Sequence, residues 1–326
     1  MREVPDRRLK PWTPPTYTVD GRGKLVGATP GPHHNWGRWG DDDQYGTTNL
    51  LTPECAVAGA QLVRRGARFA LGLPIGGGFE APSTRPPPIH TFFSSNADII
   101  VGDAADYGLP MSDDVVVLPL QGSTQIDGLG HFVHNDVLYN GFWAGVVTAS
   151  SGSRRLGVHH QARGIVGRGV LLDIAGVLGI DPFESPITPD MLDDCAQREG
   201  VTIRSGDILL VRTGYVGTWL AQPEVRKRRK QSGLTVATIP WLKEHDVAVV
   251  ASDNSAVEAI GDQFLPPMSW HAAALGDLGL TVGELFDLDE LAADCADDGV
   301  YEFFFTAAPL PIINAVGSPL NPIAIK

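Results

Sequence analysis

The chain has 326 residues, of which 43% are hydrophobic, and 25 Lys and Arg residues stand against 38 Asp and Glu residues, a formal net charge of −13. This composition predicts a folded protein with a large buried core and argues against a disordered chain. The acidic balance disfavours nucleic acid or an anionic membrane as the main partner, because both attract basic surfaces.

The start of the chain is rich in proline, glycine and charge, which predicts an extended N-terminal arm over residues 1–35. The rest of the chain, residues 36–326, is expected to form a single domain. Early in that domain, Thr52 stands where a helix N-cap would, and Pro53 occupies the first helical position. We therefore predict a helix that continues through residues 56–67.

Short apolar runs bounded by glycine and proline follow from about residue 70, and such runs are typical of buried strands. Helix signals lie between them. Thr188 and Pro189 open one helix that Gly200 ends, and another is expected over residues 236–244. The alternation predicts a mixed α/β domain with one main core. The predicted buried strands lie at residues 115–118, 169–173, 208–211 and 247–250.

The cysteines and the N-terminus bear on the compartment. Cys55, Cys195 and Cys295 lie far apart and show no CxxC spacing, which indicates reduced thiols rather than a disulfide framework. The N-terminus lacks the apolar core of a signal peptide, and no run of 18 apolar residues occurs. We therefore expect a cytoplasmic protein that does not span a membrane.

The segment QGSTQIDGLGH, which begins at Gln121, carries polar residues at alternating positions. In an extended strand these side chains face one side, with Gln125 and Asp127 about 7 Å apart and within reach of one ion or substrate. His131 lies too far along a straight strand, so the two glycines before it are expected to bend the chain and bring it back. The same alternation also fits the solvated face of an edge strand.

This segment resembles the signature of the metal-dependent cyclase family, which includes kynurenine formamidase and isatin hydrolase and whose pattern runs His-x-Gly-Thr-His-x-Asp-x-Pro-x-His. Thr124, Asp127 and His131 match that pattern. Gln121 and Gln125 replace its two earlier histidines, which are metal ligands in the family. The chain is similar to a branch that carries Thr-Gln-x-Asp, and the similarity extends over nearly everything after residue 35. The other similar stretches are RWGDDDQYGTTN at 38–49, YNG at 139–141, GRGVLLD at 167–173, GDILLVRTG at 206–214 and GSPLNPIAI at 317–325.

The resemblance implies an α/β fold of the swivelling β/β/α type with a mixed sheet. It also implies a divalent metal ion held by Asp127, His271, Glu284 and Gln125. Imidazole and carboxylate ligands suit Mn or Zn, and amide oxygens in place of two imidazoles shift the preference from Zn towards Mn or Mg, so we expect Mn. Other interpretations stay open. Thr281-Val-Gly-Glu284 has the form of a helix capping box, and His271 could be a packing histidine at a helix start.

By the same resemblance, the implied activity is metal-dependent hydrolysis of an amide, lactam or related C–N bond, or of a lactone, in a small molecule. His131 would act as general acid and base beside Asp127. We expect a homodimer or homotetramer. The alternatives are a lyase or cyclase that stabilises an enolate with the same ion, and a metal-free binding protein on the same scaffold. The residues expected to contact substrate are Gln121, His134, Arg212, Trp39 and Trp143. The alternatives are a structural ion pair for Arg212 and core packing for the two tryptophans.

Overall fold

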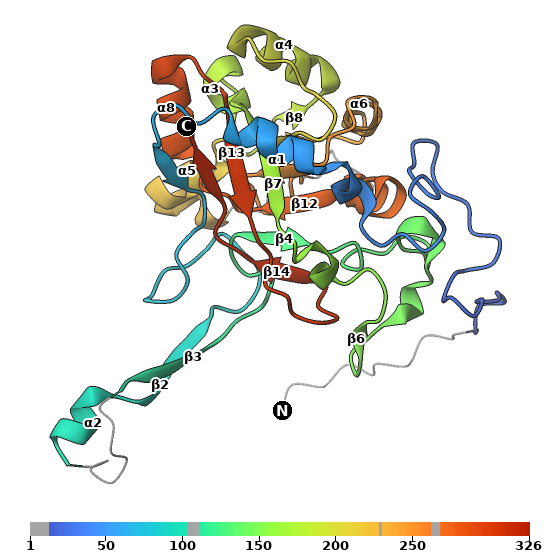
Figure 1. Cartoon of the computed structure of the whole chain (residues 1–326), viewed down its shortest axis with the longest axis horizontal. Helices are drawn as coiled ribbons and strands as arrows, with labels where there is room; N and C mark the ends of the chain where they lie inside the picture. The colour runs from blue at the N-terminus through green and yellow to red at the C-terminus, as the bar shows by residue number, and fades with distance from the viewer. Residues whose placement is uncertain (1–12, 103–110, 228–229, 262–267) are drawn as a thin grey trace, which may run out of the picture.

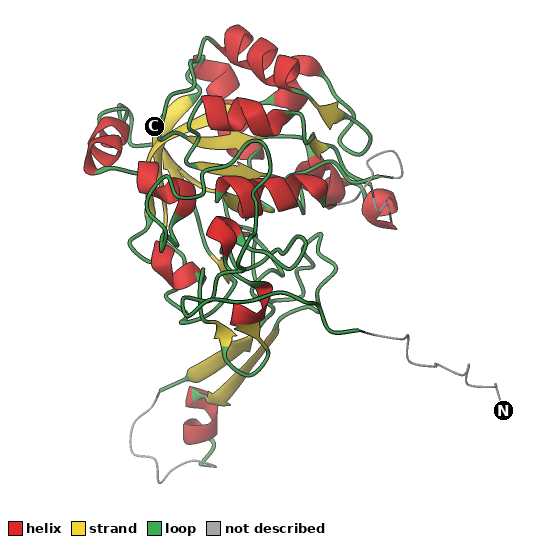
Figure 2. Cartoon of the chain, turned by 90° about the vertical axis from the view of Figure 1, so that its right-hand side faces the viewer, coloured by secondary structure: helices red, strands yellow, loops and turns green. Residues whose placement is uncertain are grey.

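The computed structural model describes residues 13–102, 111–227, 230–261 and 268–326. Within these residues the chain is built on a nine-stranded mixed sheet that helices cover on both faces. A two-stranded arm stands off this body (Figures 1 and 2). The predicted mixed α/β architecture is therefore confirmed.

The large sheet has a parallel centre and antiparallel edges. Its strands are β1 (Arg68–Ala70), β4 (Gln125–Asp127), β7 (Ile165–Leu172), β9 (Ile208–Val211), β11 (Val249–Ser252), β12 (Thr281–Glu284), β13 (Glu302–Ala307), β14 (Gly317–Pro319) and β15 (Ile323–Ile325). They lie in the order β1-β15-β13-β7-β9-β11-β12-β4-β14. The four central strands, β7, β9, β11 and β12, run parallel to one another, and the other neighbouring pairs run antiparallel. Parallel strands are buried on both faces, which is why their sequences are continuous apolar runs.

Helices close the two faces of the sheet and create two main core clusters. On one face, α4, α6 and α7 bury Leu192, Leu242 and Trp270, and on the other face α8 buries Leu291. The α-helices of the body are α1 (Pro53–Ala60), α3 (Ile174–Leu178), α4 (Pro189–Glu199), α5 (Tyr215–Ala221), α6 (Thr238–Glu244), α7 (Ser269–His271) and α8 (Asp289–Asp298). The shorter elements are η1 (Gly46–Leu50), η3 (Tyr139–Gly141), η4 (Ala144–Val146), η5 (Val158–Gln161), η6 (Pro223–Lys227), the π-helical η7 (Ala272–Leu278), β5 (Val147–Thr148), β6 (Gly152–Ser153), β8 (Pro186–Ile187) and β10 (Gly233–Leu234).

Two of the predicted helices begin where they were expected to, and the helix expected over 236–244 begins two residues later, at Thr238. α4 begins at Pro189 and stops at Gly200, whose left-handed φ of 70° ends the helix as predicted. α1 begins at Pro53 but ends at Ala60, well before residue 67. The reason is tertiary: the backbone N–H groups of residues 65–67 donate to the carbonyl of Lys326, which draws this segment out of the helix and onto the sheet.

One strand prediction is wrong in its burial. Three of the four predicted runs lie in the buried sheet, but residues 115–118 belong to the arm, where β3 (Asp113–Val117) pairs with β2 (Ile89–Ser94). Most side chains of both strands are exposed. A short helix, α2 (Asn96–Ile100), lies at the far end of the arm and begins with a capping box. An apolar run predicts a strand, but it cannot tell which surface covers that strand.

The described part of the predicted N-terminal arm, residues 13–35, lies irregularly against this chain's own body, while residues 1–12 lie outside the described residues. Lys24 forms an isolated bridge with Phe142, and the Asn35 side chain donates to the carbonyl of Leu278 at 2.9 Å. In the described part of the chain, no helix is long and apolar enough to cross a membrane.

Candidate metal centre

The site begins with two paired strands of the large sheet. β4 and β12 run antiparallel, and their register sets Gln125 opposite Glu284 and Asp127 opposite Val282. Because side chains alternate between the two faces of a strand, Gln125 and Asp127 share one face while Ile126 packs into the core on the other. The polar alternation predicted from the sequence is therefore a buried one, and the solvated edge-strand interpretation is wrong.

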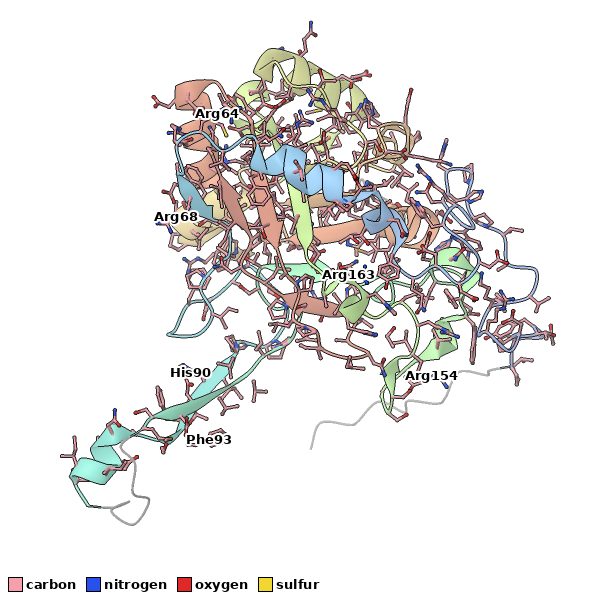
Figure 3. All side chains as sticks on the ribbon, in the orientation of Figure 1. Arg64, Arg68, His90, Phe93, Arg154 and Arg163 are labelled. Carbon is pink, nitrogen blue, oxygen red and sulfur yellow. The ribbon has the colours of Figure 1, made fainter. Side chains whose placement is uncertain are left out.

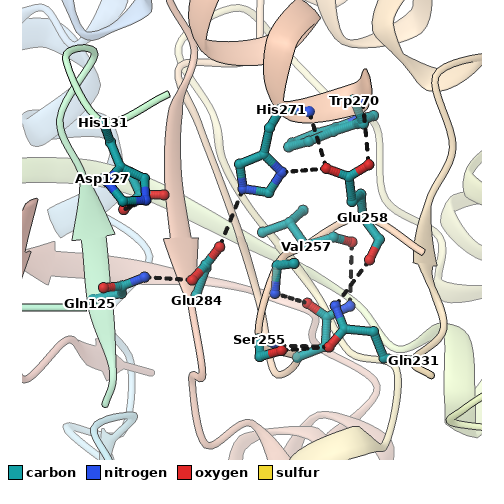
Figure 4. A network of polar contacts seen from close by, with 12 residues as sticks. Gln125, Asp127, His131, Gln231, Ser255, Val257, Glu258, Trp270, His271 and Glu284 are labelled. Atoms are coloured by element: carbon teal, nitrogen blue, oxygen red, sulfur yellow. Dashed lines mark hydrogen bonds and ion pairs between the residues drawn. The ribbon is translucent and has the colours of Figure 1, made fainter. Parts of the chain in front are cut away.

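His271 reaches the same place from α7. One potential ligand atom from each of Asp127, His271 and Glu284 lies within 4.8 Å of the other two. All three residues are buried, with 0%, 1% and 5% of their surface exposed (Figure 4). Glu284 stands on strand β12, so the helix capping box suggested by Thr281-Val-Gly-Glu284 does not form.

The donor set fits a divalent cation. Both carboxylate oxygens of Asp127 are buried and have no hydrogen-bond partner. A buried carboxylate in that state is costly unless a cation or a proton balances its charge. Two carboxylates and one imidazole are ligands that Mn and Zn accept. A divalent ion bound between these three residues would therefore balance their charge. Three uncharged side chains in the same positions would need no ion.

The acidities of these groups show how the charge is balanced by protons when no ion is bound. Burial, together with the negative charge of Glu284, raises the pKa of Asp127 well above its ordinary value. For His271, burial lowers the pKa, but hydrogen bonds to Glu258 and Glu284 outweigh that effect and raise its pKa to about 10. A cation that binds here replaces these protons, so we expect its binding to release them.

Glu258 completes the site and was missed in the sequence. Its Oε1 lies 2.5 Å from Nδ1 of His271, while Nε2 of that ring faces Glu284 Oε1 at 3.3 Å. A carboxylate on one ring nitrogen fixes a histidine so that the other nitrogen can bind a metal. Glu258 lies in the loop after β11, and loops after the carboxyl ends of parallel strands commonly form sites. That position was the signal available in the sequence.

Gln125 fixes a neighbouring carboxylate. Its Nε2 donates to Oε2 of Glu284, and its Oε1 is buried without a hydrogen-bond partner. The glutamine that replaces a histidine of the family pattern therefore does two things. It holds Glu284 in place, and it leaves a neutral oxygen in the same buried space.

His131 returns to the site through the expected bend. Its backbone N–H donates to the carbonyl of Gly128, and its Nε2 lies 3.9 Å from Asp127 Oδ1. Glycine is required at the bend because of close packing: a Cβ at Gly130 would collide with the Ser153 hydroxyl. The His131 side chain is 23% exposed, so this residue connects the buried triad to solvent. Burial lowers the pKa of His131 and favours a neutral imidazole.

Gln121 lies at the margin of the site. Its Nε2 is buried without a hydrogen-bond partner. It packs against Gly317 of β14, where a side chain would collide with it. Because β14 pairs with β4, Gln121 stands beside the strand that carries Gln125 and Asp127.

The remaining residues predicted to contact substrate have partners outside the triad. Arg212 forms ion pairs with Asp173 and Asp289, both at 2.8 Å, as the alternative of a structural ion pair requires. The other three make their contacts outside the triad as well: Trp39 stacks under Arg38, Trp143 donates to Tyr17, and exposed His134 lines a hollow with Trp36 and Asp277. Their residue types alone could not show which side of the fold they occupy.

Comparison with known proteins identifies the family to which the chain belongs. The sequence model of the family described as "Putative cyclase" matches residues 35–259, which is more than half of the chain. The chain belongs to this cyclase family. The family predicted from the segment around Asp127 is therefore confirmed.

Solved structures similar to this cyclase-family chain share its fold. A crystal structure described as that of a novel cyclase is 40% identical, with a TM-score of 0.84, and the match covers 91% of this chain and 100% of that one. Isatin hydrolase A from Labrenzia aggregata is 19% identical, with a TM-score of 0.58 and coverage of 81% and 94%. A "predicted metal-dependent hydrolase" from Bacillus stearothermophilus is 16% identical, with a TM-score of 0.50 and coverage of 80% and 98%. No curated protein sequence matches the chain.

Proposed function

We propose that this cyclase-family chain is a metal-dependent hydrolase that cleaves an amide, lactam or related C–N bond, or a lactone, in a small molecule. The observation that carries the proposal is the state of Asp127, whose two buried oxygens have no hydrogen-bond partner and face Glu284 and His271. Such a carboxylate destabilises the fold unless it binds something positive, so its presence in the core points to a function.

The residues that would hold the ion are the carboxylates of Asp127 and Glu284, Nε2 of His271 and Oε1 of Gln125. Three oxygen ligands and one nitrogen favour Mn, with Zn or Mg as the other candidates. When bound, the ion supplies a Lewis acid that polarises a carbonyl group and acidifies water. Glu258 keeps His271 in the orientation that this role needs.

His131 is placed to move the proton. It is the partly exposed member of the site, and its neutral ring has a free electron pair. A neutral imidazole can accept a proton from the attacking water and then donate that proton to the leaving nitrogen. Asp127, 3.9 Å away, stabilises the imidazolium between the two transfers.

The structural neighbours support hydrolysis as the reaction class. Two of them are described as an isatin hydrolase and as a predicted metal-dependent hydrolase. Isatin hydrolase, by its name, opens a compound that contains a cyclic amide. Cyclic amides and formamides are therefore the first substrates to test on this chain.

Metal analysis of the purified protein tests the proposal. We expect one divalent ion per chain in the wild type, its loss in Asp127→Ala and Glu284→Ala, and its retention in Glu244→Ala, which removes an exposed carboxylate. His131→Asn should keep the ion and lower kcat by at least about 100-fold. A protein that binds no ion and is not activated by Mn, Zn or Mg would contradict the proposal and favour a metal-free binding protein. Transfer of labelled oxygen from water to product separates hydrolysis from a lyase reaction.

A further inference from the structure

The polar side chains that the core leaves without partners gather on one short segment. Among the described residues, eight buried side-chain atoms have no hydrogen-bond partner, and five of these atoms belong to Gln121, Ser123, Gln125 and Asp127. Buried polar atoms in folded proteins nearly always have a partner, so a concentration of exceptions indicates a place where a ligand supplies the partner. Gln125 and Asp127 face the candidate metal centre, whereas Ser123 lines a separate cavity.

This cavity has a volume of about 260 Å³ and opens at the root of the arm, where the chain enters β2 and leaves β3. Phe79 and Trp219 give it apolar walls. Ser123 lies two residues before Gln125 in the sequence, so their Cα atoms are at most about 7 Å apart. The cavity is therefore next to the candidate metal centre, and its lining is that of a small-molecule site.

The charged residues that line the cavity give it a net positive charge, because Arg85 and Arg226 outnumber the single carboxylate of Glu80. The guanidinium carbon of Arg226 lies 4.5 Å from the centre of the Trp219 ring, and its Nε donates to the Trp219 carbonyl at 3.3 Å. Arg85 is exposed, and its guanidinium has no ion pair or hydrogen bond with any described residue. A guanidinium that the protein leaves free beside an apolar cavity is suited to bind an anion.

The charge of Arg85 also reaches the metal centre. Burial has the largest effect on the pKa values of Asp127 and His131, raising the first and lowering the second. The positive charge of Arg85 acts on both groups as well, and it lowers both pKa values. Because such interactions weaken with distance and with intervening water, an anion bound by Arg85 would be a neighbour of the candidate metal centre.

We propose that this cavity binds the substrate and that Arg85 selects a small apolar molecule with one carboxylate. This assignment rests on the proposed hydrolysis, because it names the substrate class of that reaction. The planar guanidinium binds both oxygens of the carboxylate, while the apolar part of the molecule packs against Phe79 and Trp219. The other end of the molecule, which carries the bond to be cleaved, extends past Ser123 towards Asp127.

One negative charge, rather than two, fits this cavity. The two arginines and one glutamate in its lining balance a single carboxylate, and Glu80 repels a doubly charged group such as a phosphate ester. The chain's net charge of −13 adds to that repulsion. The expected substrates are therefore monocarboxylates with an amide, lactam or lactone bond, and Arg85 is the residue that determines this specificity.

A matched pair of substrates tests the role of Arg85. Formamidobenzoate and formanilide carry the same formamide and differ only in one carboxylate. With the Mn-loaded wild type, we expect kcat/KM to be at least about 10-fold higher for formamidobenzoate. Arg85→Gln should remove this preference by raising KM about 10–100-fold rather than by lowering kcat, because the lost contact binds the ground state and the transition state equally. The control is Arg64→Gln, which removes an exposed arginine far from the arm (Figure 3) and should keep the preference.

Benzoate binding, measured by calorimetry, makes the test independent of turnover. The wild type should bind benzoate at least about 10-fold more tightly than benzyl alcohol, and Arg85→Gln should lose that difference. Benzoate binding that depends on Arg85, in a protein that hydrolyses neither formamide and no cyclic amide or lactone, would support the carboxylate site and overturn the hydrolase. Equal kcat/KM for the two formamides, or benzoate binding that Arg85→Gln leaves unchanged, would overturn the carboxylate site and leave the hydrolase standing.

Discussion

At the scale of single residues, the candidate site is defined by side chains that burial leaves short of partners. The carboxylate of Asp127 has no hydrogen-bond partner, and Glu284 shares its carboxylate between Gln125 and His271. Their proximity destabilises the metal-free protein and creates affinity for a cation in the same step, because like charges repel each other and attract the ion. Stability and metal binding should therefore change in opposite directions when one charge is removed.

Asp127→Asn tests this opposition. In the presence of a chelator, the variant should be more stable than the wild type by about 1–2 kcal/mol, because the wild type must take up a proton at Asp127 in order to fold and the amide need not. With Mn added, the order should reverse, since only the wild type gains from the ion. Urea unfolding in both conditions measures the effect.

Asp136→Asn makes the same chemical change at an exposed position and should alter neither value. Equal Mn binding by wild type and Asp127→Asn would show that Asp127 is not a ligand.

Glu258→Gln tests the positioning of His271. The amide can still accept a hydrogen bond from the ring, but it no longer carries the charge that makes the ring a stronger ligand. We expect Mn affinity to fall about 10–100-fold, as measured by calorimetry, and the metal-free protein to lose stability as well, because Glu258 also partners the protonated ring of His271. The matched control is Glu244→Gln on the surface. An unchanged affinity would mean that Glu258 serves only the packing of α7.

At the scale of elements, ion pairs of Arg168 link three neighbouring strands of the large sheet. Arg168 on β7 bonds Asp207, just before β9, and Glu302 on β13, both at 2.5 Å. We predict that Arg168→Met lowers the free energy of unfolding by about 3–5 kcal/mol, because it leaves two carboxylates without their cation. Urea denaturation measures the loss. Arg198→Met, which breaks the exposed Arg198–Asp194 pair, should cost less than about 1 kcal/mol. Similar losses for both variants would refute this account.

A second link ties α4 to the end of β7 and depends on pH. Oε1 of Glu199 accepts the backbone N–H of Asp173, and burial raises the pKa of Glu199 from 4.5 to about 8. An acid whose pKa rises on folding binds its proton more tightly in the folded state, so folding stability falls as pH increases from 4.5 towards 8.

Glu199→Gln removes that dependence while keeping the oxygen acceptor. The variant and the wild type should be equally stable at pH 4, and the variant should be more stable by about 2–4 kcal/mol at pH 8.5. Chemical denaturation across this pH range measures the difference. Glu244→Gln is again the control, and a constant gap at all pH values would contradict the assignment.

The elements also show what the sequence could reveal. The parallel strand Ile208–Val211 was predicted correctly because burial on both faces requires an unbroken apolar run. Strand β12 was not predicted, because Thr281 and Glu284 satisfy a helix-start pattern. Only its pairing with β11 and β4 makes this segment a strand. Local pattern and tertiary pairing disagreed there, and pairing determined the structure.

At the scale of the whole molecule, the family resemblance predicted the mixed sheet and the triad of Asp127, His271 and Glu284. It could not show which side chains the aromatic and basic residues contact, such as Arg38 for Trp39, Tyr17 for Trp143 and Asp173 for Arg212. Those positions depend on how long loops cross the surface, for which the sequence contains no periodic signal. The exposed arm could not be predicted either, because the apolar residues of its strands are typical of a buried strand.

The order of strands around the site has a consequence for the protein's synthesis. β4 emerges from the ribosome well before its two neighbours, β12 and β14, which are made from residues 281–284 and 317–319. When Asp127 has been synthesised, Glu284 still lies 157 residues further along the sequence and has not been made. Contacts of such long range form late in folding. The growing polypeptide should consequently capture no metal until its final strands are released, which makes cofactor loading a step that follows translation.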